Sequence, residues 1–424
     1  MMKKKKENKM NIELVIEFLT TEYDFRYNEV TNQTEYKQKE SLVFKTINDK
    51  EFSTIYVNCN YHVFCTQHDL KSYFQSNRIK VFNPFLDYLN SLPKWDKTSY
   101  ISQLAKTVKT SNDSYFEWCF EKWIVGVVAT MINDNVTNHQ CMILAGPQGI
   151  GKSTWVDSLI PHQLKRYYYS GNIDLKNKDT LYNLSSKFLI NLDELANLTY
   201  KSVTQLKEIV TKGNISYRKV YGHFDDNYIR RASFIGSVNG LEFLYDLTGN
   251  RRFLSNEIIS FENSGRHNIN MDLVFAEAFY KYKNGFKYWF DENDQVRVEE
   301  HNKAFLVVTA EEELLLKHFS PSPISIERLK DMIGKLDSYS KSEKEQLILD
   351  YIPYLNVPVY LTATEIYSKT IYHIPTRGDI PKFGKIINRC NFIRTKKGDR
   401  YVYKVYANSV FTFEYVLKNG KVGK

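Results

Sequence analysis

Residues 141–154 read Cys-Met-Ile-Leu-Ala-Gly-Pro-Gln-Gly-Ile-Gly-Lys-Ser-Thr, an apolar run followed by a glycine-rich loop. The run predicts a buried strand, and the loop matches the pattern G-x-x-x-x-G-K-[ST], which holds phosphate between a strand and a helix. Glycines let backbone N–H groups curl around an anion. Lys152 is expected to contact the β- and γ-phosphates of ATP, and the Ser153 hydroxyl to bind Mg²⁺. The residues expected to line the nucleotide are Gly146, Pro147, Gln148, Gly149, Ile150, Gly151, Lys152, Ser153 and Thr154.

A second apolar run, residues 187–192, ends in the adjacent carboxylates Asp193 and Glu194. Such a pair at the carboxyl edge of a parallel sheet faces the bound ligand. We expect Asp193 to hold Mg²⁺ through its water shell and Glu194 to polarise the attacking water. A solvated strand end is the alternative. Because a kinase needs no base for water, the pair favours an ATPase.

A third run, residues 232–238, leads into Asn239, whose amide could orient the attacking water. Arg251 and Arg252 follow. The planar fork of a guanidinium stabilises charge on a phosphoryl group in the transition state, so this pair predicts an arginine finger. Such fingers often come from a neighbouring subunit, which implies a ring. A surface ion pair is the alternative.

The segment 215–231 alternates enough to form a hairpin with cationic and aromatic side chains, including Arg218, Lys219 and His223. In a ring, a hairpin at this place can point into the pore and grip the phosphates and bases of single-stranded DNA. Ordinary surface packing is the alternative for each of these residues.

Positive charge is concentrated at the C-terminus. Residues 360–424 carry 13 Lys and Arg against 4 Asp and Glu, an excess equal to the net charge of +9 for the whole chain. Two expected helices, 361–371 and 380–391, followed by a hairpin over 392–406, predict a winged helix that contacts duplex DNA. A protein-docking module and a solvated surface are the alternatives. The cations expected at the DNA are Lys382, Lys385, Arg389, Arg394, Lys396, Lys397 and Arg400.

The chain has 424 residues, of which 42% are hydrophobic and 25% charged. This composition excludes a disordered or low-complexity protein and predicts two to three domains. The longest apolar stretch, 123–132, is shorter than the roughly 18 to 20 residues that cross a bilayer. The basic start leads into an amphipathic helix with acidic residues, so we expect a cytoplasmic protein without a membrane segment. Five scattered cysteines without a Cys-x-x-Cys pair argue against zinc and disulfides.

These patterns predict an α/β fold. Its core is a P-loop NTPase domain with a parallel sheet, accompanied by a small α+β N-terminal region and a C-terminal winged helix. The expected divisions are an N-terminal region at 1–135, the ATPase domain at 136–290, a helical connector at 291–355 and the basic winged helix at 356–424.

Four ordered motifs resemble the virulence-associated protein E (VapE or VirE) family. They are Gly-Pro-Gln-Gly-Ile-Gly-Lys-Ser-Thr, Asn-Leu-Asp-Glu-Leu, Phe-Ile-Gly-Ser-Val-Asn and Thr-Gly-Asn-Arg-Arg-Phe, and the segment 83–96 also resembles the stretch before the ATPase in that family. The family occurs in phages, pathogenicity islands and other mobile elements. It is similar to superfamily 3 and AAA+ helicases.

The resemblance implies roles for individual residues. Lys152 and Ser153 match the Walker A residues, Asp193 and Glu194 the Walker B pair, Asn239 the sensor, and Arg251 and Arg252 the finger region. Residues 217–223 depart from the family's Tyr-Arg-x-Pro-Tyr-Gly-Arg by lacking the proline and the final arginine. Some relatives carry a primase domain ahead of the ATPase. The N-terminal region here shows no paired-carboxylate primase signature, so we expect a separate primase.

Together these features predict an Mg²⁺-dependent ATPase that forms a hexameric ring, moves on single-stranded DNA and unwinds the origin of a phage or mobile element. The main rival is a regulatory switch, in which the nucleotide controls a DNA- or partner-binding tail without unwinding. A scaffold with a degenerate site is a third reading, and the intact Lys152, Asp193 and Glu194 argue against it.

Overall fold

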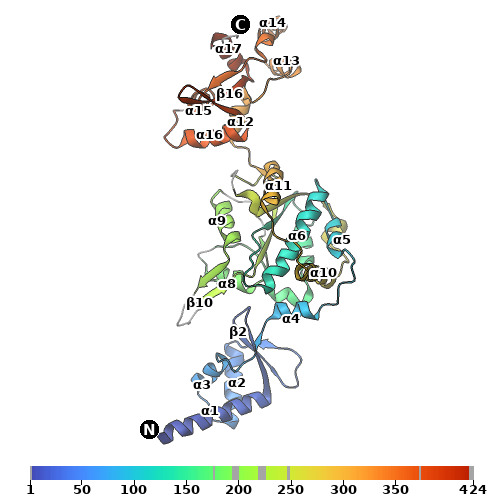
Figure 1. Ribbon diagram of the computed structural model, residues 1–424, viewed down its shortest axis with the longest axis vertical. Helices are drawn as coiled ribbons and strands as arrows, with labels where there is room; N and C mark the ends of the chain where they lie inside the picture. Colours follow the sequence, from blue (N-terminus) through green and yellow to red (C-terminus); the bar gives the residue numbers. More distant parts are fainter. Residues whose placement is uncertain are drawn as a thin grey trace. The chain divides into compact units, whose positions relative to one another are not determined.

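The computed structural model describes residues 2–174, 177–192, 200–217, 226–245, 249–371 and 374–419. The chain divides into two compact units, Met1–Leu306 and Val307–Lys424, here called unit 1 and unit 2. Figure 1 follows both from the N-terminus in blue to the C-terminus in red. The expected connector, residues 291–355, falls on both sides of this division. In the described part of the chain, no helix combines the length and the apolar character needed to span a bilayer.

Unit 1 begins with an N-terminal module, residues 2–82, in which a four-stranded sheet of order β3-β2-β1-β4 packs with three helices. Its core is formed by buried side chains that include Val15 and Leu19, one turn apart on the first helix. The helix expected at the basic start is present as the first element, and an antiparallel hairpin follows it. The elements are α1 (Met2–Glu22), β1 (Tyr23–Asn28), β2 (Gln33–Gln38), β3 (Lys45–Thr46), α2 (Asp49–His62), α3 (Gln67–Phe74) and β4 (Val81–Phe82).

The rest of unit 1 is built on a six-stranded sheet of order β5-β12-β6-β11-β8-β7. All neighbours in it pair in parallel except β5, which pairs antiparallel with β12 at one edge. The α/β prediction is confirmed, with the correction that the sheet is mixed instead of wholly parallel. The strands are β5 (Val108–Thr110), β6 (Cys141–Gly146), β7 (Tyr168–Ser170), β8 (Leu189–Leu192), β11 (Ser233–Asn239) and β12 (Phe253–Phe261).

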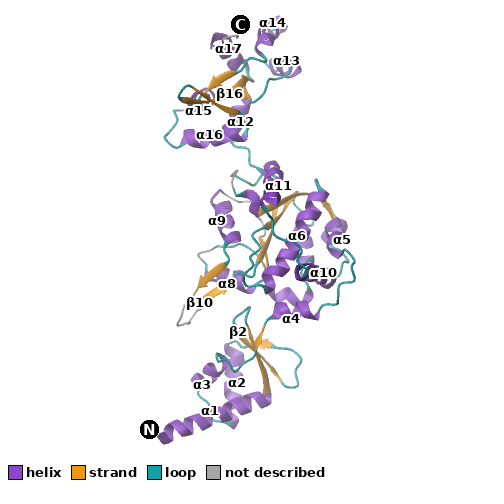
Figure 2. Cartoon of the chain, viewed as in Figure 1, coloured by secondary structure: helices purple, strands orange, loops and turns teal. Residues whose placement is uncertain are grey.

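Helices cover both faces of this sheet (Figure 2). Side chains alternate along β6, so that Met142 and Leu144 enter one core while Ile143 and Ala145 enter the other. The first core takes in α6, which is apolar around most of its circumference, and the second takes in α9. The helices are α4 (Pro84–Ser91), α5 (Tyr100–Lys106), α6 (Asp113–Ile132), α7 (Lys152–Ser158), α8 (Lys178–Ser186), α9 (Tyr200–Thr211), α10 (Met271–Lys283) and α11 (Glu292–Asn302).

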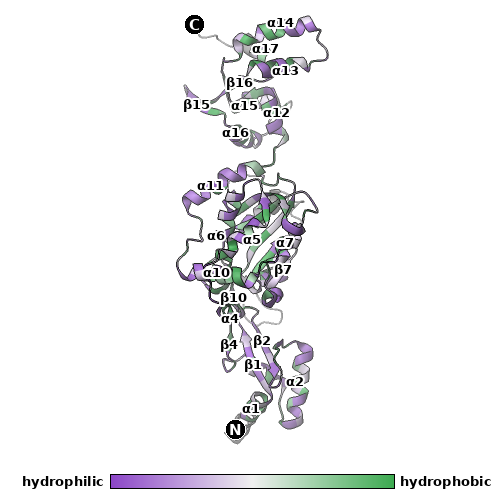
Figure 3. Cartoon of the chain, turned by 90° about the vertical axis from the view of Figure 1, so that its right-hand side faces the viewer, coloured by the Kyte–Doolittle hydropathy of each residue, from purple (hydrophilic) through white to green (hydrophobic). Residues whose placement is uncertain are grey.

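The helix α11 is hydrophilic along most of its length (Figure 3), but its buried Val298 joins the first core. Unit 1 therefore continues through a segment whose charged sequence predicts only a connector. A small antiparallel pair, β9 (Asn214–Tyr217) and β10 (Asp226–Ile229), completes this unit and confirms the pairing expected for the segment 215–231.

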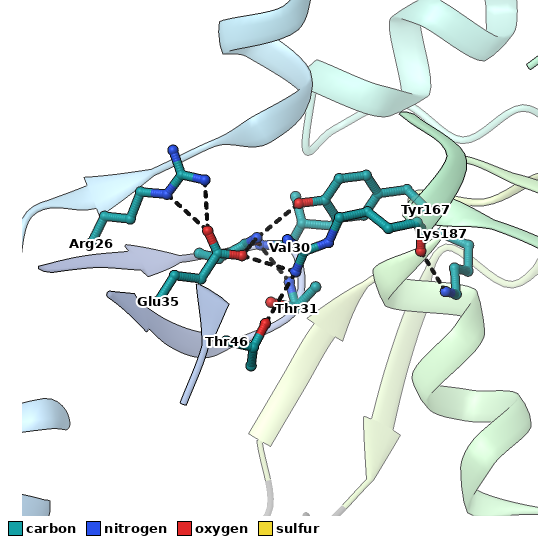
Figure 4. Close-up of polar contacts among 9 residues, drawn as sticks. Arg26, Val30, Thr31, Glu35, Thr46, Tyr167 and Lys187 are labelled. Carbon is teal, nitrogen blue, oxygen red and sulfur yellow. Dashed lines mark hydrogen bonds and ion pairs between the residues drawn. The ribbon is translucent and has the colours of Figure 1, made fainter. Parts of the chain in front are cut away.

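Polar contacts join the N-terminal module to the segment that follows α7 (Figure 4). The carboxylate of Glu35 is fully buried and pairs with Arg26 Nη2 at 2.7 Å and Arg166 Nη2 at 2.9 Å. Asn28 Nδ2 donates both to Glu35 Oε1 and to the Tyr167 hydroxyl, each at 2.9 Å. Since a buried carboxylate needs partners for its lone pairs, these contacts hold the module against the domain built on the six-stranded sheet.

In unit 2, strand β16 lies between β14 and β15 and pairs antiparallel with both. The two expected helices are present as α15 and α16, with ends one or two residues from the expected ones, and they pack on this sheet through Ile366 and Phe383. A second core lies around α13, α14 and α17. The elements are α12 (Ala310–His318), β13 (Phe319–Ser320), α13 (Ile326–Gly334), α14 (Lys341–Tyr351), β14 (Val359–Leu361), α15 (Ala363–Thr370), α16 (Asp379–Arg389), β15 (Ile393–Lys397), β16 (Arg400–Ala407) and α17 (Val410–Asn419).

Candidate functional site

The glycine-rich loop leaves β6 near the middle of the six-stranded sheet and enters α7. Gly151 ends it with φ +105°, in the left-handed region, and a Cβ there would lie 2.5 Å from the Ser264 carbonyl oxygen. Only glycine fits this turn without moving the backbone of the neighbouring segment. Gly149, with φ +81°, borders open space. The loop is thus packed on one side and open on the other.

Lys152 is buried beneath this loop. Its Nζ donates hydrogen bonds to the carbonyl oxygens of Gly146 at 2.8 Å and Pro147 at 2.7 Å. Burial lowers the pKa of Lys152 from its ordinary value. Among the described residues, only neutral groups contact this ammonium. An anion would make stronger hydrogen bonds with it than these carbonyl oxygens do.

Asn239 lies beside the same lysine. In the parallel pairing of β11 with β6, Asn239 is opposite Gly146, so the carboxyl end of β11 reaches the start of the loop. Asn239 Oδ1 accepts a hydrogen bond from Lys152 Nζ at 3.1 Å. The side chain is otherwise exposed. The structure thus places side by side two residues that are 87 positions apart in the chain. Two different motifs of the sequence identify them as site residues.

The next strand, β8, ends at the same edge, since Leu192 is opposite Gly236 in its parallel pairing with β11. Asp193 and Glu194 follow β8 in sequence and lie outside the described residues. Ser153, the other residue expected to bind Mg²⁺, is exposed in the first turn of α7, as is Thr154. Across the described ranges, no group of three His, Cys, Asp or Glu side chains is placed to hold a metal ion.

The two arginines lie at the opposite end of the strands, where β6 and β12 begin. They form the end of a short 3₁₀ turn, Asn250–Arg252, directly before Phe253, which pairs with Cys141 at the start of β6. Cys141 and Gly146 are five residues apart along β6, and at about 3.3 Å per residue this separates the arginines from the loop by about 17 Å. Neither arginine can therefore reach a phosphate held by the loop of its own chain. Arg251 is exposed, whereas Arg252 is half-buried and donates from Nη1 to the Gly249 carbonyl oxygen at 3.3 Å.

The three residues expected to grip single-stranded DNA, Arg218, Lys219 and His223, lie outside the described residues. The strands on either side of them, β9 and β10, are paired over four residues each.

Most of the cations expected at duplex DNA are exposed in unit 2. Lys382 and Lys385 lie one turn apart on α16, and Lys396, Lys397 and Arg400 lie at the tip of the β15–β16 hairpin. Within the described part of the chain, none of these five forms an ion pair with a carboxylate.

Arg389 does not belong with this exposed group. Its guanidinium is largely buried, forms an ion pair with Glu312 and donates from Nη2 to the Val307 carbonyl oxygen at 3.2 Å. Burial lowers its pKa from the ordinary value. These contacts tie α16 to α12, so the structure gives Arg389 a place in the packing of unit 2.

The sequence alone assigned no DNA-binding role to two tyrosines on the same surface, Tyr360 and Tyr401. The ring of Tyr401 lies under the Arg394 guanidinium, with 4.0 Å to the ring centroid, and that of Tyr360 under Lys397 Nζ at 3.3 Å. Aromatic residues alternating with cations in this basic segment are the signal that could have identified them.

Comparison with known proteins gives one family match. The model of the virulence-associated protein E-like domain matches residues 89–307, more than half of the chain, and the match ends where unit 1 ends. No curated protein matches the chain.

Among solved structures, an apo structure of the NrS-1 C-terminal region is similar with a TM-score of 0.48 and 15% identity, covering 93% of this chain and 98% of that one. An A-form apo structure of the same region has a TM-score of 0.48 and 14% identity, with 93% and 99% covered.

Proposed function

Because the chain belongs to the family of proteins with a virulence-associated protein E-like domain, we propose that it is an Mg²⁺-dependent ATPase. In this proposal, ATP hydrolysis drives movement along single-stranded DNA during replication of a phage or mobile element. The observation that carries it is the meeting of Lys152 and Asn239 at the carboxyl edge of the sheet, beside an open glycine-rich loop.

The loop residues fit a phosphate chain. Gly146, Gly149 and Gly151 shape a backbone that is open to solvent at Gly149 and closed against Ser264 at Gly151. Lys152 would exchange its carbonyl partners for phosphate oxygens, which carry more charge and make stronger hydrogen bonds with an ammonium. Its burial keeps water from competing for that contact.

Two residues would hold Mg²⁺, Ser153 directly and Asp193 through water. Bound Mg²⁺ neutralises charge on the phosphate oxygens. Glu194, in its sequence-based role, would take the proton of the attacking water. Asn239 would accept a hydrogen bond from that water or donate one to it, and the bond between Asn239 and Lys152 supports this role because it places the amide beside the loop.

The position of Arg251 and Arg252 supports a ring. Both lie about 17 Å from the loop of their own chain, along β6, so either could stabilise charge only on a nucleotide held by a neighbouring copy. A closed ring, such as a hexamer, gives every loop one such neighbour. Arg251 is the better candidate for the finger because it is exposed.

Unit 2 would bind duplex DNA through its exposed cations, which have no carboxylate partners within the described part of the chain. The order of β14, β16 and β15, with α15 and α16 packed on these strands, supports the proposal of a winged helix. Phosphate contacts of this kind position a protein without reading sequence. A separate primase would supply the priming activity.

ATP turnover by the purified chain, measured with and without single-stranded DNA, tests this proposal. We expect DNA to raise turnover at least several-fold, and Lys152→Ala to remove turnover in both conditions. Slow turnover that DNA does not change would favour the regulatory switch instead.

A further inference from the structure

A cavity lies beside Arg251 and Arg252, at the end of the central sheet where its parallel strands begin. Its volume is about 280 Å³, and it lies between the segment before β6, the end of α9, the turn before β12 and the segment before α11. Its lining residues are Thr137, Asn138, His139, Gln140, Thr211, Arg251, Arg252, Tyr288, Trp289, Phe290 and Gln295.

The lining carries positive charge and no acidic side chain. Two guanidinium groups, those of Arg251 and Arg252, face it without an ion-pair partner among the described residues. Arg252 uses one donor on the Gly249 carbonyl, and its Nε has no partner among the described residues. A guanidinium offers five N–H donors in a fork that matches phosphate oxygens, and contacts among the described residues use only one of those of Arg252.

One wall of the cavity is aromatic. Trp289 exposes 54% of its surface, although tryptophan is usually well buried. The neighbouring Tyr288 ring stands nearly perpendicular to the indole, with centroids 5.5 Å apart. An exposed indole beside cationic groups is the arrangement that stacks a nucleobase.

The amides of Gln140 and Gln295 complete the lining. Gln295 Nε2 donates to the Phe290 carbonyl oxygen at 2.9 Å. Side-chain amides can hydrogen-bond the edge of a base.

We propose that this cavity binds a nucleoside phosphate, with the base stacked on Trp289 and the phosphate held by Arg252. A cavity of about 280 Å³ lies near the lower end of the range for small-molecule sites and suits a single nucleotide unit. That unit is either a free nucleotide or one residue of a single-stranded nucleic acid, since both present the same base and phosphate.

This site is separate from the glycine-rich loop because the two lie at opposite ends of β6. The inference therefore does not rest on ATP hydrolysis. Arg251 remains exposed and can serve a neighbouring chain while Arg252 holds the phosphate.

The test measures tryptophan fluorescence of the full chain carrying Lys152→Ala, so that the loop contributes no binding. The probes are AMP, a ten-residue oligothymidylate and adenosine. We expect saturable quenching by AMP, by the oligonucleotide or by both, and none when Trp289→Phe is added. Trp95→Phe is the matched control, because Trp95 packs against Tyr280 outside the cavity and its loss should leave the quenching in place.

Comparing AMP with the oligonucleotide distinguishes a free nucleotide from a single-stranded nucleic acid as the ligand. Stronger binding of AMP identifies a free nucleotide as the ligand, and stronger binding of the oligonucleotide identifies a strand. Adding Arg252→Gln should weaken either probe about tenfold, as expected for one charged hydrogen-bond partner. Quenching that survives Trp289→Phe, no saturable quenching by either probe, or equal binding of adenosine and AMP would each overturn the assignment.

Discussion

The ammonium of Lys152 illustrates how a single residue is kept ready for an anion. Two carbonyl oxygens and one amide oxygen hold it at 2.7 to 3.1 Å, and no carboxylate among the described residues pairs with it. Burial lowers the pKa of Lys152 because it keeps water from the charged form. A bound phosphate would stabilise the charged form and raise that pKa again. Nucleotide affinity should therefore fall at high pH, when Lys152 loses its proton.

Asn239 provides a prediction at the same scale. Replacing it with alanine removes the amide that we assign to the attacking water and with it one hydrogen bond of Lys152, while the bonds of Lys152 to the Gly146 and Pro147 carbonyl oxygens do not involve Asn239. We expect Asn239→Ala to lower kcat about a hundredfold, the usual effect of losing one oriented hydrogen bond in a transition state. The dissociation constant for ADP should change no more than a few-fold, which equilibrium binding can measure.

Thr20→Ala is a suitable control, because Thr20 is exposed on α1 of the N-terminal module and its hydroxyl bonds only within that helix among the described residues. If Asn239→Ala and Thr20→Ala have equal kcat values, the amide has no part in hydrolysis.

Individual residues differ in how far the sequence predicts their place. Asn239 comes beside the loop because parallel strands end at one edge, and apolar runs reveal such strands. Arg389 is different. Its partner Glu312 lies 77 positions earlier on another helix, and no local pattern reports such a contact. Charge alone predicted DNA contact for Arg389, and its burial gives it a structural role.

At the scale of elements, the β15–β16 hairpin is where unit 2 concentrates free positive charge. Lys397 and Arg400 are opposite one another across the turn, and the turn has Gly398 at φ +59°. The like charges of Lys397 and Arg400 repel each other in the free chain. An anionic partner would relieve this repulsion, which favours the bound state.

Charge reversal tests this surface. We expect Lys396→Glu with Lys397→Glu to weaken binding to duplex DNA at least tenfold for every sequence, and to reduce the dependence of affinity on salt, because phosphate contacts release counter-ions. Fluorescence anisotropy at several salt concentrations measures both.

The matched control is Lys330→Glu with Lys341→Glu, which changes the charge of unit 2 equally on exposed positions of α13 and the start of α14. Equal losses in the two variants would mean that net charge matters and the hairpin surface does not.

Long apolar or amphipathic elements were predictable, and short edge elements were not. The helix α6 and the strands β6 and β11 have patterns that local sequence reveals. The strand β5 has three residues and is defined by its partner β12, whose own run includes the polar residues Ser255, Asn256 and Glu257. Polar residues in that strand are buried by tertiary contacts, such as that of Asn256 with Leu254 and Met142, which sequence periodicity does not report.

At the scale of the whole molecule, the central sheet separates the two halves of the candidate catalytic site. Lys152 and Asn239 lie at the carboxyl edge, and Arg251 and Arg252 at the amino edge. A site completed by the next copy in a ring explains why one chain keeps them apart. The order of motifs along the sequence predicts all four residues. Only the strand register shows that they cannot meet within one chain.

The most direct measurement is ATP turnover by mixed assemblies. Lys152→Ala chains and Arg251→Ala, Arg252→Ala chains would be produced together, with each single type as the reference. In a mixed ring, some interfaces combine an intact loop with intact arginines, so we predict turnover well above that of either variant alone. If co-produced chains are as inactive as the separate variants, while wild-type chains turn over ATP, the site is not shared between copies and the account is wrong.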